Sequence, residues 1–123
     1  MTTTPEGRVS AALRQEVIKA GGEIRKVQWQ GRVGAPDWLV MAWGGAVFVE
    51  TKAPGEVPRA SQIVEFRRLY HASGIPVLVL DRAADAVEVV NLLRARANGN
   101  REAYVRRCDC YSFERYPGVT LCG

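Results

Sequence analysis

The stretch from residue 37 to residue 52, which reads DWLVMAWGGAVFVETK, constrains the fold of this chain more than any other. Two apolar runs, residues 38–43 and 46–51, lie on either side of Gly44 and Gly45. A Gly-Gly pair between two strand-like runs is typical of a β-hairpin with a two-residue turn. The sequence therefore predicts two antiparallel strands joined at these glycines.

The position of the turn also predicts which residues of the hairpin face one another. With the two glycines as the turn, Trp43 faces Ala46 and Asp37 faces Lys52. Directly opposed residues project from the same face of a sheet, and so do alternate residues of one strand. We therefore expect Asp37, Glu50 and Lys52 to share one face at the open end of the hairpin.

Two interpretations fit these three charges. The first is a structural ion pair between Lys52 and either carboxylate at the exposed end of the hairpin. The second is a metal site, in which Asp37 and Glu50 offer oxygen ligands to Mg²⁺ or Mn²⁺ and Lys52 contacts a nucleophilic water or a phosphate. The hairpin alone does not decide between them.

Size and composition favour one intracellular globular domain. The chain has 123 residues, 47% of them hydrophobic, which is enough for one core but short for two domains. No apolar run approaches the ~20 residues that span a bilayer, and the first residues lack the apolar stretch of a signal peptide. The net charge of +4 suits a nucleic-acid partner without establishing one. The three cysteines, an odd number that argues against a disulfide framework, are Cys108, Cys110 and Cys122.

The segment before the hairpin predicts a helix with an acid in its first turn. Thr4 and Pro5 are typical of a helix start, and apolar residues recur at helical spacing up to a break at 21–22. Glu6 lies seven residues before Leu13, and two turns of 3.6 residues bring both to within roughly 20° of the same face. We therefore expect Glu6 to point inward as a site carboxylate, or else to stabilise the helix dipole.

The remaining expected elements surround the hairpin. They are a strand at 23–29, a loop at 31–36, a helix at 59–73, a buried strand at 76–81 and a helix at 83–97. Gln62 falls on the apolar stripe of its helix, where a buried amide needs a hydrogen-bond partner. It either reaches the charges at the end of the hairpin or bonds the backbone at the helix end.

Several short motifs, taken in chain order, resemble the VRR-NUC family, a compact branch of the PD-(D/E)xK nucleases. The matching residues are Glu6, Gly21-Gly22 with Lys26, Gly34-Ala35-Pro36-Asp37, Glu50-Thr51-Lys52, Ser61-Gln62 and Gly74. The resemblance implies an α/β fold with a restriction-endonuclease-like αβββαβ core, in which helices flank a mixed sheet, followed by an additional helix and a tail. Residues 1–97 are then the nuclease core, and residues 98–123 are an extension of unknown role.

The resemblance also implies a divalent-metal-dependent nuclease that hydrolyses phosphodiester bonds of DNA, with Mg²⁺ or Mn²⁺ as cofactor. The implied catalytic residues are Asp37, Glu50, Lys52 and Gln62. The implied metal ligands are Glu6, Asp37, Glu50 and the backbone carbonyl of Thr51. Trp38 departs from the family, which usually has a basic or small polar residue there, so substrate contacts at this position do not carry over.

Partners and location complete these expectations. DNA is the expected partner, in replication, repair or recombination, and the sequence leaves open whether the substrate is a flap, a branched junction or a plain duplex. The candidate nucleic-acid contacts are Lys26, Arg32, Arg59 and Arg67. A homodimer is expected, since two sites related by a twofold axis can cut both strands. The expected location is the cytoplasm, which is the host's cytoplasm for a phage protein. The alternatives are a non-catalytic DNA-binding module on the same fold and a structural subunit.

Overall fold

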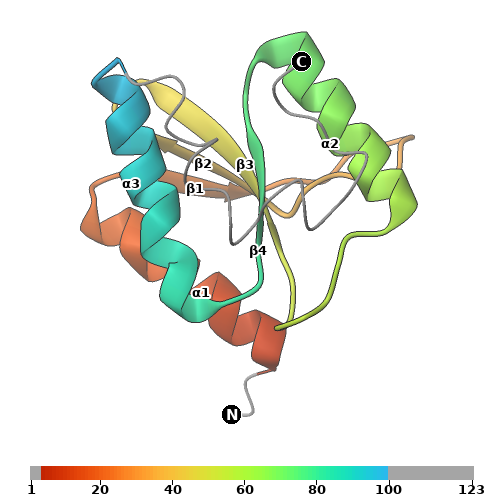
Figure 1. The fold of residues 1–123 in the computed structure, drawn as a ribbon, viewed down its shortest axis with the longest axis horizontal. Coiled ribbons are helices and arrows are strands. Elements are labelled where there is room, and N and C mark those ends of the chain that lie inside the picture. Colours follow the sequence, from red (N-terminus) through yellow and green to blue (C-terminus); the bar gives the residue numbers. More distant parts are fainter. Residues whose placement is uncertain (1–3, 100–123) are drawn as a thin grey trace.

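The structure, a computed structural model, describes residues 4–99. Its elements follow the predicted α/β order (Figure 1). They are α1 (Pro5–Lys19), β1 (Glu23–Lys26), β2 (Trp38–Ala42), β3 (Gly45–Thr51), α2 (Ala60–Ser73), β4 (Val77–Leu80), a 3₁₀ turn η1 (Ala83–Asp85) and α3 (Ala86–Ala97). The predicted extension, apart from residues 98–99, lies outside the described residues, and so do its cysteines.

The strands form one mixed sheet in the order β1-β2-β3-β4. β1, β2 and β3 are antiparallel neighbours, whereas β4 runs parallel to β3. Helices α1 and α3 contact each other on one side of the sheet, and α2 lies on the other side (Figure 1). This arrangement confirms the expected α/β fold, a mixed sheet flanked by helices.

The core lies mainly between the sheet and the pair α1 and α3. From α1, the predicted stripe of Val9, Leu13 and Val17 is at most 1% exposed. All of β4 is buried, as its continuous apolar run indicates. Fully burying a side chain such as valine or leucine stabilises the fold by roughly 1.5–3 kcal/mol, so this shared core fixes the helices against the sheet.

The hairpin turn lies one residue earlier than the sequence predicts. Ala42 pairs with Gly45, so the turn consists of Trp43 and Gly44, whose φ angles are 52° and 77°. Two positive φ values are what a type I′ turn requires, and this turn matches the twist of the flanking strands. Arg94 of α3 lies over the Trp43 ring, 5.0 Å from its centroid. The predicted turn at the two glycines is therefore wrong, because Trp43 takes the turn position under Arg94 and Gly45 joins β3.

The corrected register changes the partner of Asp37. Trp38 pairs with Val49, and extending the ladder by one residue places Asp37 opposite Glu50. The predicted pairing of Asp37 with Lys52 is therefore wrong. Each residue of β2 pairs with a residue of β3 that lies two positions earlier than predicted. A shift of two positions leaves every side chain on its predicted face.

The chain leaves the sheet after Lys26, so the strand predicted at 23–29 is shorter than expected. Trp29 instead packs edge-on against Phe48 of β3, with ring centroids 6.3 Å apart. Burial of the indole against β3 thus takes precedence over the alternating pattern that predicted a longer strand.

Gly34 fixes the path of the loop that leads into β2. Its φ is 92°, and a Cβ at this position would lie 2.9 Å from the carbonyl oxygen of Ser61 in α2. Glycine tolerates both the positive φ and the close approach. This contact between backbones sets where the chain enters β2, and therefore where Asp37 lies.

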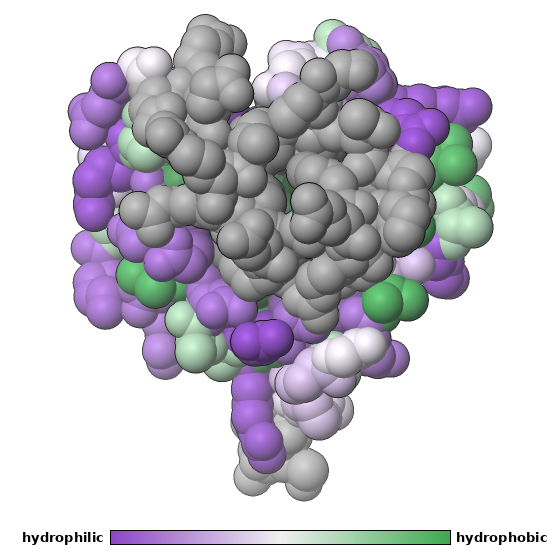
Figure 2. Space-filling model, in the orientation of Figure 1, coloured by the Kyte–Doolittle hydropathy of each residue, from purple (hydrophilic) through white to green (hydrophobic). Residues whose placement is uncertain are grey.

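On the face that Figure 2 shows, the visible described residues are mostly hydrophilic, with hydrophobic residues scattered among them. The most exposed large hydrophobic residues are Val33 at 75% and Ile18 at 64%, and single exposed side chains of this kind are ordinary. Within residues 4–99, no helix is both long and apolar enough to cross a bilayer.

Candidate active site

Asp37 is held at the start of β2 by hydrogen bonds from β3. Its Oδ2 accepts a hydrogen bond from the backbone N–H of Thr51 at 3.0 Å and another from the Thr51 hydroxyl at 2.9 Å. The other oxygen, Oδ1, lies 3.5 Å from Nζ of Lys26. Asp37 thus has two fixed neighbours, Thr51 and Lys26, in place of the predicted Lys52.

The Thr51 hydroxyl connects this carboxylate to α1. It donates to Asp37 and accepts a hydrogen bond from Oγ of Ser10 at 3.1 Å. Sequence reasoning missed Ser10 as a site residue. The available signal was its position four residues after Glu6, which places both on one strip of the helix surface.

Glu50 lies at the end of β3 and is only 3% exposed. Its Oε2 accepts a hydrogen bond from Nε2 of Gln62 at 2.7 Å and lies 3.2 Å from Nζ of Lys52. Burial raises the pKa of the Glu50 carboxyl above its ordinary 4.5, and repulsion from Asp37 adds to the increase. The contacts with Gln62 and Lys52 act in the opposite direction without cancelling it.

Gln62 uses both ends of its side-chain amide. Its Oε1 accepts a hydrogen bond from the backbone N–H of Arg59 at 3.0 Å, while its Nε2 donates to Glu50. The sequence left open whether this glutamine bonds the helix end or the site. In the structure it does both, so the start of α2 positions Glu50.

Glu6 lies in the first turn of α1. The sequence predicts that it points inward, but the structure leaves Glu6 exposed, together with Thr4 and Pro5. Helical phase alone predicted the direction, and it does not account for the exposure of the first turn of α1. One turn further along, Ser10 contacts Thr51, and residues four apart such as Glu6 and Ser10 lie on the same strip of a helix.

The paired carboxylates Asp37 and Glu50 fit a hard divalent cation. In the described part of the chain, Glu50 Oε1 is buried without a hydrogen-bond partner, which leaves an oxygen for a ligand. A cation near both groups would also offset the repulsion that raises the Glu50 pKa. No group of three or more acidic, histidine or cysteine side chains between residues 4 and 99 is arranged to hold an ion. Backbone and water oxygens would therefore complete the octahedral shell that Mg²⁺ requires.

Known proteins resemble this chain in sequence and in structure. No family model matches the sequence. Over 77 residues, the chain is 46% identical to "Putative nuclease p44" of Acyrthosiphon pisum secondary endosymbiont phage 1, a match that covers 62% of this chain and 82% of the phage protein. A solved structure described as a VRR_NUC domain superposes with a TM-score of 0.65 at 32% identity, covering 72% of this chain and 97% of the solved one.

The chain belongs to the VRR-NUC family. This confirms the family inferred from the sequence motifs. Membership of the VRR-NUC family, together with a relative named as a nuclease, supports a nuclease function for the chain.

The basic residues predicted to contact nucleic acid lie in different surroundings in this VRR-NUC fold. Lys26 borders the site through Asp37. Arg32 is occupied elsewhere, since its Nε lies 3.1 Å from Oε1 of the buried Glu65. Arg59 is exposed at the start of α2, and Arg67 is half-buried on the same helix. A nucleic-acid role for all four stays a prediction.

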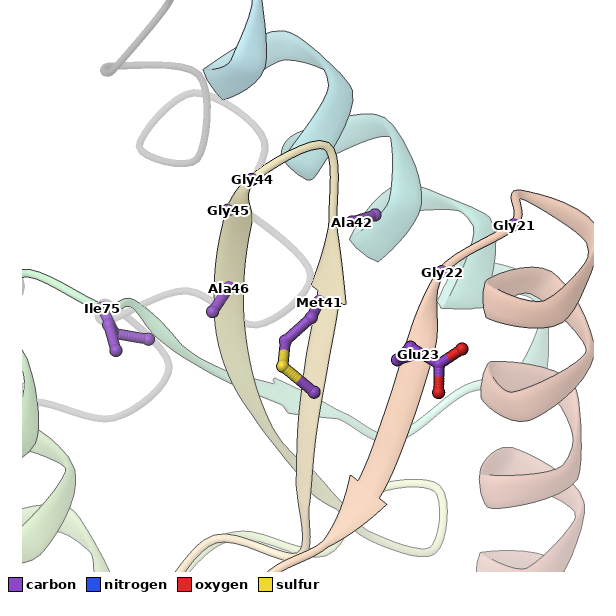
Figure 3. A pocket seen from close by; sticks show the side chains of 9 residues that line it. All are labelled: Gly21, Gly22, Glu23, Met41, Ala42, Gly44, Gly45, Ala46 and Ile75. Atoms are coloured by element: carbon purple, nitrogen blue, oxygen red, sulfur yellow. The ribbon is translucent and has the colours of Figure 1, made fainter.

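A pocket of about 630 Å³ lies at the opposite end of the hairpin, and none of the predicted site residues lines it (Figure 3). Its walls are mainly glycine and alanine with Met41 and Ile75. The charged residue Glu23 also lines it, but this carboxylate is paired with Arg25 at 2.6 Å. The pocket therefore offers no chemistry comparable to that at the open end of the hairpin.

Proposed function

We propose that this VRR-NUC protein is a metal-dependent deoxyribonuclease that hydrolyses phosphodiester bonds of DNA. The observation that carries the proposal is the buried Glu50 carboxylate, which has one free oxygen and lies close enough to Asp37 for repulsion between them to raise its pKa. Lys52 pairs with only one of the two Glu50 oxygens, and the pKa stays raised in spite of that pair. The second oxygen, buried beside a second acid, is therefore the place where a metal cation would be stabilising.

The residues proposed to hold Mg²⁺ or Mn²⁺ are Asp37, Glu50, the backbone carbonyl of Thr51 and, from the exposed first turn of α1, Glu6. When bound, the ion would polarise the phosphate and lower the pKa of a coordinated water, as metal ions do in hydrolytic enzymes. Asp37 is oriented for this role by Thr51, and Glu50 by Gln62. Each carboxylate therefore has a defined orientation, because hydrogen bonds hold one of its two oxygens.

Lys52 is proposed to act on the phosphate itself. Its ammonium group lies 3.2 Å from Glu50, and its side chain is 16% exposed, so it is partly shielded from water and still reachable by a substrate. In this position it can donate hydrogen bonds to the attacking water and to a phosphate oxygen. Charge placed in advance where negative charge develops is an effective way to stabilise a transition state.

A cleavage assay tests the proposal directly. The full chain is incubated with labelled linear, flapped and branched DNAs in Mg²⁺, Mn²⁺ or EDTA. We expect cleavage with either metal and none in EDTA, with a preference for branched or flapped DNA. The variant Glu50→Gln should abolish cleavage, while the surface control Glu16→Gln should cleave at the wild-type rate.

Other outcomes of the same assay identify the alternatives. DNA binding without cleavage under all metal conditions would indicate a non-catalytic DNA-binding module. Full cleavage by Glu50→Gln would contradict the metal assignment. Absence of divalent-cation binding in calorimetry, with and without DNA, would exclude the enzyme.

The protein is further proposed to act as a homodimer on DNA in the cytoplasm, or in the host cytoplasm for a phage protein. One domain offers one site, and a twofold dimer provides two for the two strands. Light scattering on the full chain measures this: a monomer mass at assay concentration, with normal cleavage, would rule the dimer out.

A further inference from the structure

Trp38, the residue directly after Asp37, has two basic side chains over its ring. The guanidinium carbon of Arg14 lies 5.1 Å from the ring centroid, and Nζ of Lys26 lies 4.7 Å from it. The three residues come from three elements, α1, β1 and β2. The Trp38 ring thus gathers two positive charges at one place on the surface.

The charge of Arg14 is not neutralised within the described residues. Arg14 is exposed and contacts Trp38 without a carboxylate partner in that part of the chain. Arg25 and Arg32, by contrast, are paired with Glu23 and Glu65. Lys26 shares its charge with Asp37 at 3.5 Å, but its side chain is 64% exposed.

The Arg14–Trp38–Lys26 cluster borders the candidate active site. Arg14 lies one helical turn after Ser10, which bonds Thr51, and residues four apart lie on the same side of a helix. Lys26 contacts Asp37 itself. A DNA strand whose scissile phosphate lies at Asp37 and Glu50 therefore brings a neighbouring phosphate towards these two cations.

We propose that the Arg14–Trp38–Lys26 cluster binds a backbone phosphate of the DNA strand next to the one that is cleaved. This inference rests on the proposed nuclease function and names how the substrate is held there. Arg14 supplies the free guanidinium, which suits phosphate through its fork of N–H donors. Trp38 acts as a positioning residue, because its ring holds both cations where the strand passes.

Salt dependence of DNA binding tests the cluster separately from cleavage. Each phosphate contact contributes about 0.9 to the slope of log K against log salt concentration for duplex DNA and about 0.7 for single strands. Titrations use the full chain with Glu50→Gln in every protein, so that no strand is cut. We expect Arg14→Gln to reduce the slope by about one contact and to weaken binding several-fold at low salt.

Arg94→Gln is the matched control. Arg94 also lies over a tryptophan of the same hairpin, Trp43, at 5.0 Å, but at the far end from the site. This variant loses the same charge and the same kind of ring contact, and we expect it to leave the slope unchanged. Trp38→Leu keeps both cations but removes the ring, and it should lower affinity, whereas Trp38→Phe should retain most of it.

Two results would overturn the proposal that the cluster binds phosphate. One is an unchanged slope in Arg14→Gln, and the other is an equal loss of slope in Arg14→Gln and Arg94→Gln. If the wild type cleaves DNA in Mg²⁺ but Arg14→Gln keeps its full salt dependence, phosphate binding by the cluster is refuted and the nuclease proposal stands. If DNA is bound but never cleaved, the nuclease proposal fails, and the slopes still decide whether the cluster binds phosphate.

Discussion

Replacing Glu50 by glutamine should make the metal-free protein more stable at pH 7 and also inactive. The side chain is 3% exposed, and its pKa is raised by burial and by Asp37 even after the opposing contacts with Gln62 and Lys52 are included. The site therefore favours the neutral form over the charged form. Glutamine is a neutral side chain of the same shape that can still accept the hydrogen bond from Gln62.

The size of this effect follows from linkage. Each unit by which the folded state raises the pKa corresponds to about 1.4 kcal/mol of destabilisation once the group is charged in both states. We therefore expect Glu50→Gln to increase the free energy of unfolding at pH 7 by the amount that the raised pKa of Glu50 sets. One opposing contribution is the loss of a partner for Lys52, whose side chain retains 16% exposure and hence some hydration.

The sign of the pH dependence gives an independent check. Because the folded state holds the Glu50 proton more tightly, the wild type gains stability as the pH falls through the raised pKa towards the ordinary 4.5. Glu50→Gln should lack this gain. Urea unfolding of both proteins in EDTA between pH 7.5 and 4.5 measures the difference, which cancels the titration of groups that do not interact with Glu50.

Two controls accompany this measurement. Glu16→Gln removes a partly exposed acid that lies away from the site and pairs with Lys19 at 3.2 Å, and it should change stability by less than about 0.5 kcal/mol. Adding Mg²⁺ at 100 times its Kd should stabilise the wild type by about 2.7 kcal/mol and leave Glu50→Gln unaffected. A Glu50→Gln protein that is clearly less stable than the wild type at pH 7 would refute the reasoning, because the pair with Lys52 would then outweigh the burial of charge.

Three further predictions concern the groups that position the carboxylates. Thr51→Val removes the hydroxyl between Ser10 and Asp37, and thermal unfolding should show a loss of about 1–3 kcal/mol, with Thr51→Ser close to wild type. Gly34→Ala forces a Cβ to 2.9 Å from a carbonyl oxygen at positive φ; it should cost at least about 1–2 kcal/mol in urea unfolding, and a neutral result would contradict the described loop. Gln62→Ala should reduce cleavage and lower stability by about 1–3 kcal/mol, since it removes bonds to Arg59 and Glu50 together; wild-type cleavage by this variant would remove Gln62 from the site.

The sequence predicted the elements of this fold well because its apolar pattern is strong. The helix that carries Val9, Leu13 and Val17 and the buried strand Val77–Leu80 both follow directly from periodicity. The register of the hairpin did not, because it depends on Trp43 taking a left-handed conformation under Arg94. That contact joins residues far apart in the chain, and no local pattern encodes it.

The candidate site was predicted in composition but not in connectivity. Alternation in β3 placed Glu50 and Lys52 on one face, and they are in contact. The partners of Asp37, by contrast, come from β1 and β3, and the link to Ser10 depends on how α1 packs across the sheet. Glu6 is exposed instead of pointing inward for a similar reason. Helical phase predicts the direction of a side chain around the helix axis, but it does not predict whether another element packs over that turn of the helix.

The double use of the Gln62 amide makes the candidate active site sensitive to the first turn of one helix. Helix ends fray more readily than helix centres, and local opening of this kind needs far less free energy than global unfolding. If the turn at Arg59 opens, Gln62 loses its backbone partner and with it the orientation that presents Nε2 to Glu50. Catalytic competence would then decline on warming at temperatures where the core still keeps its native circular dichroism, and the enzyme would recover on cooling because nothing beyond one helical turn has come apart.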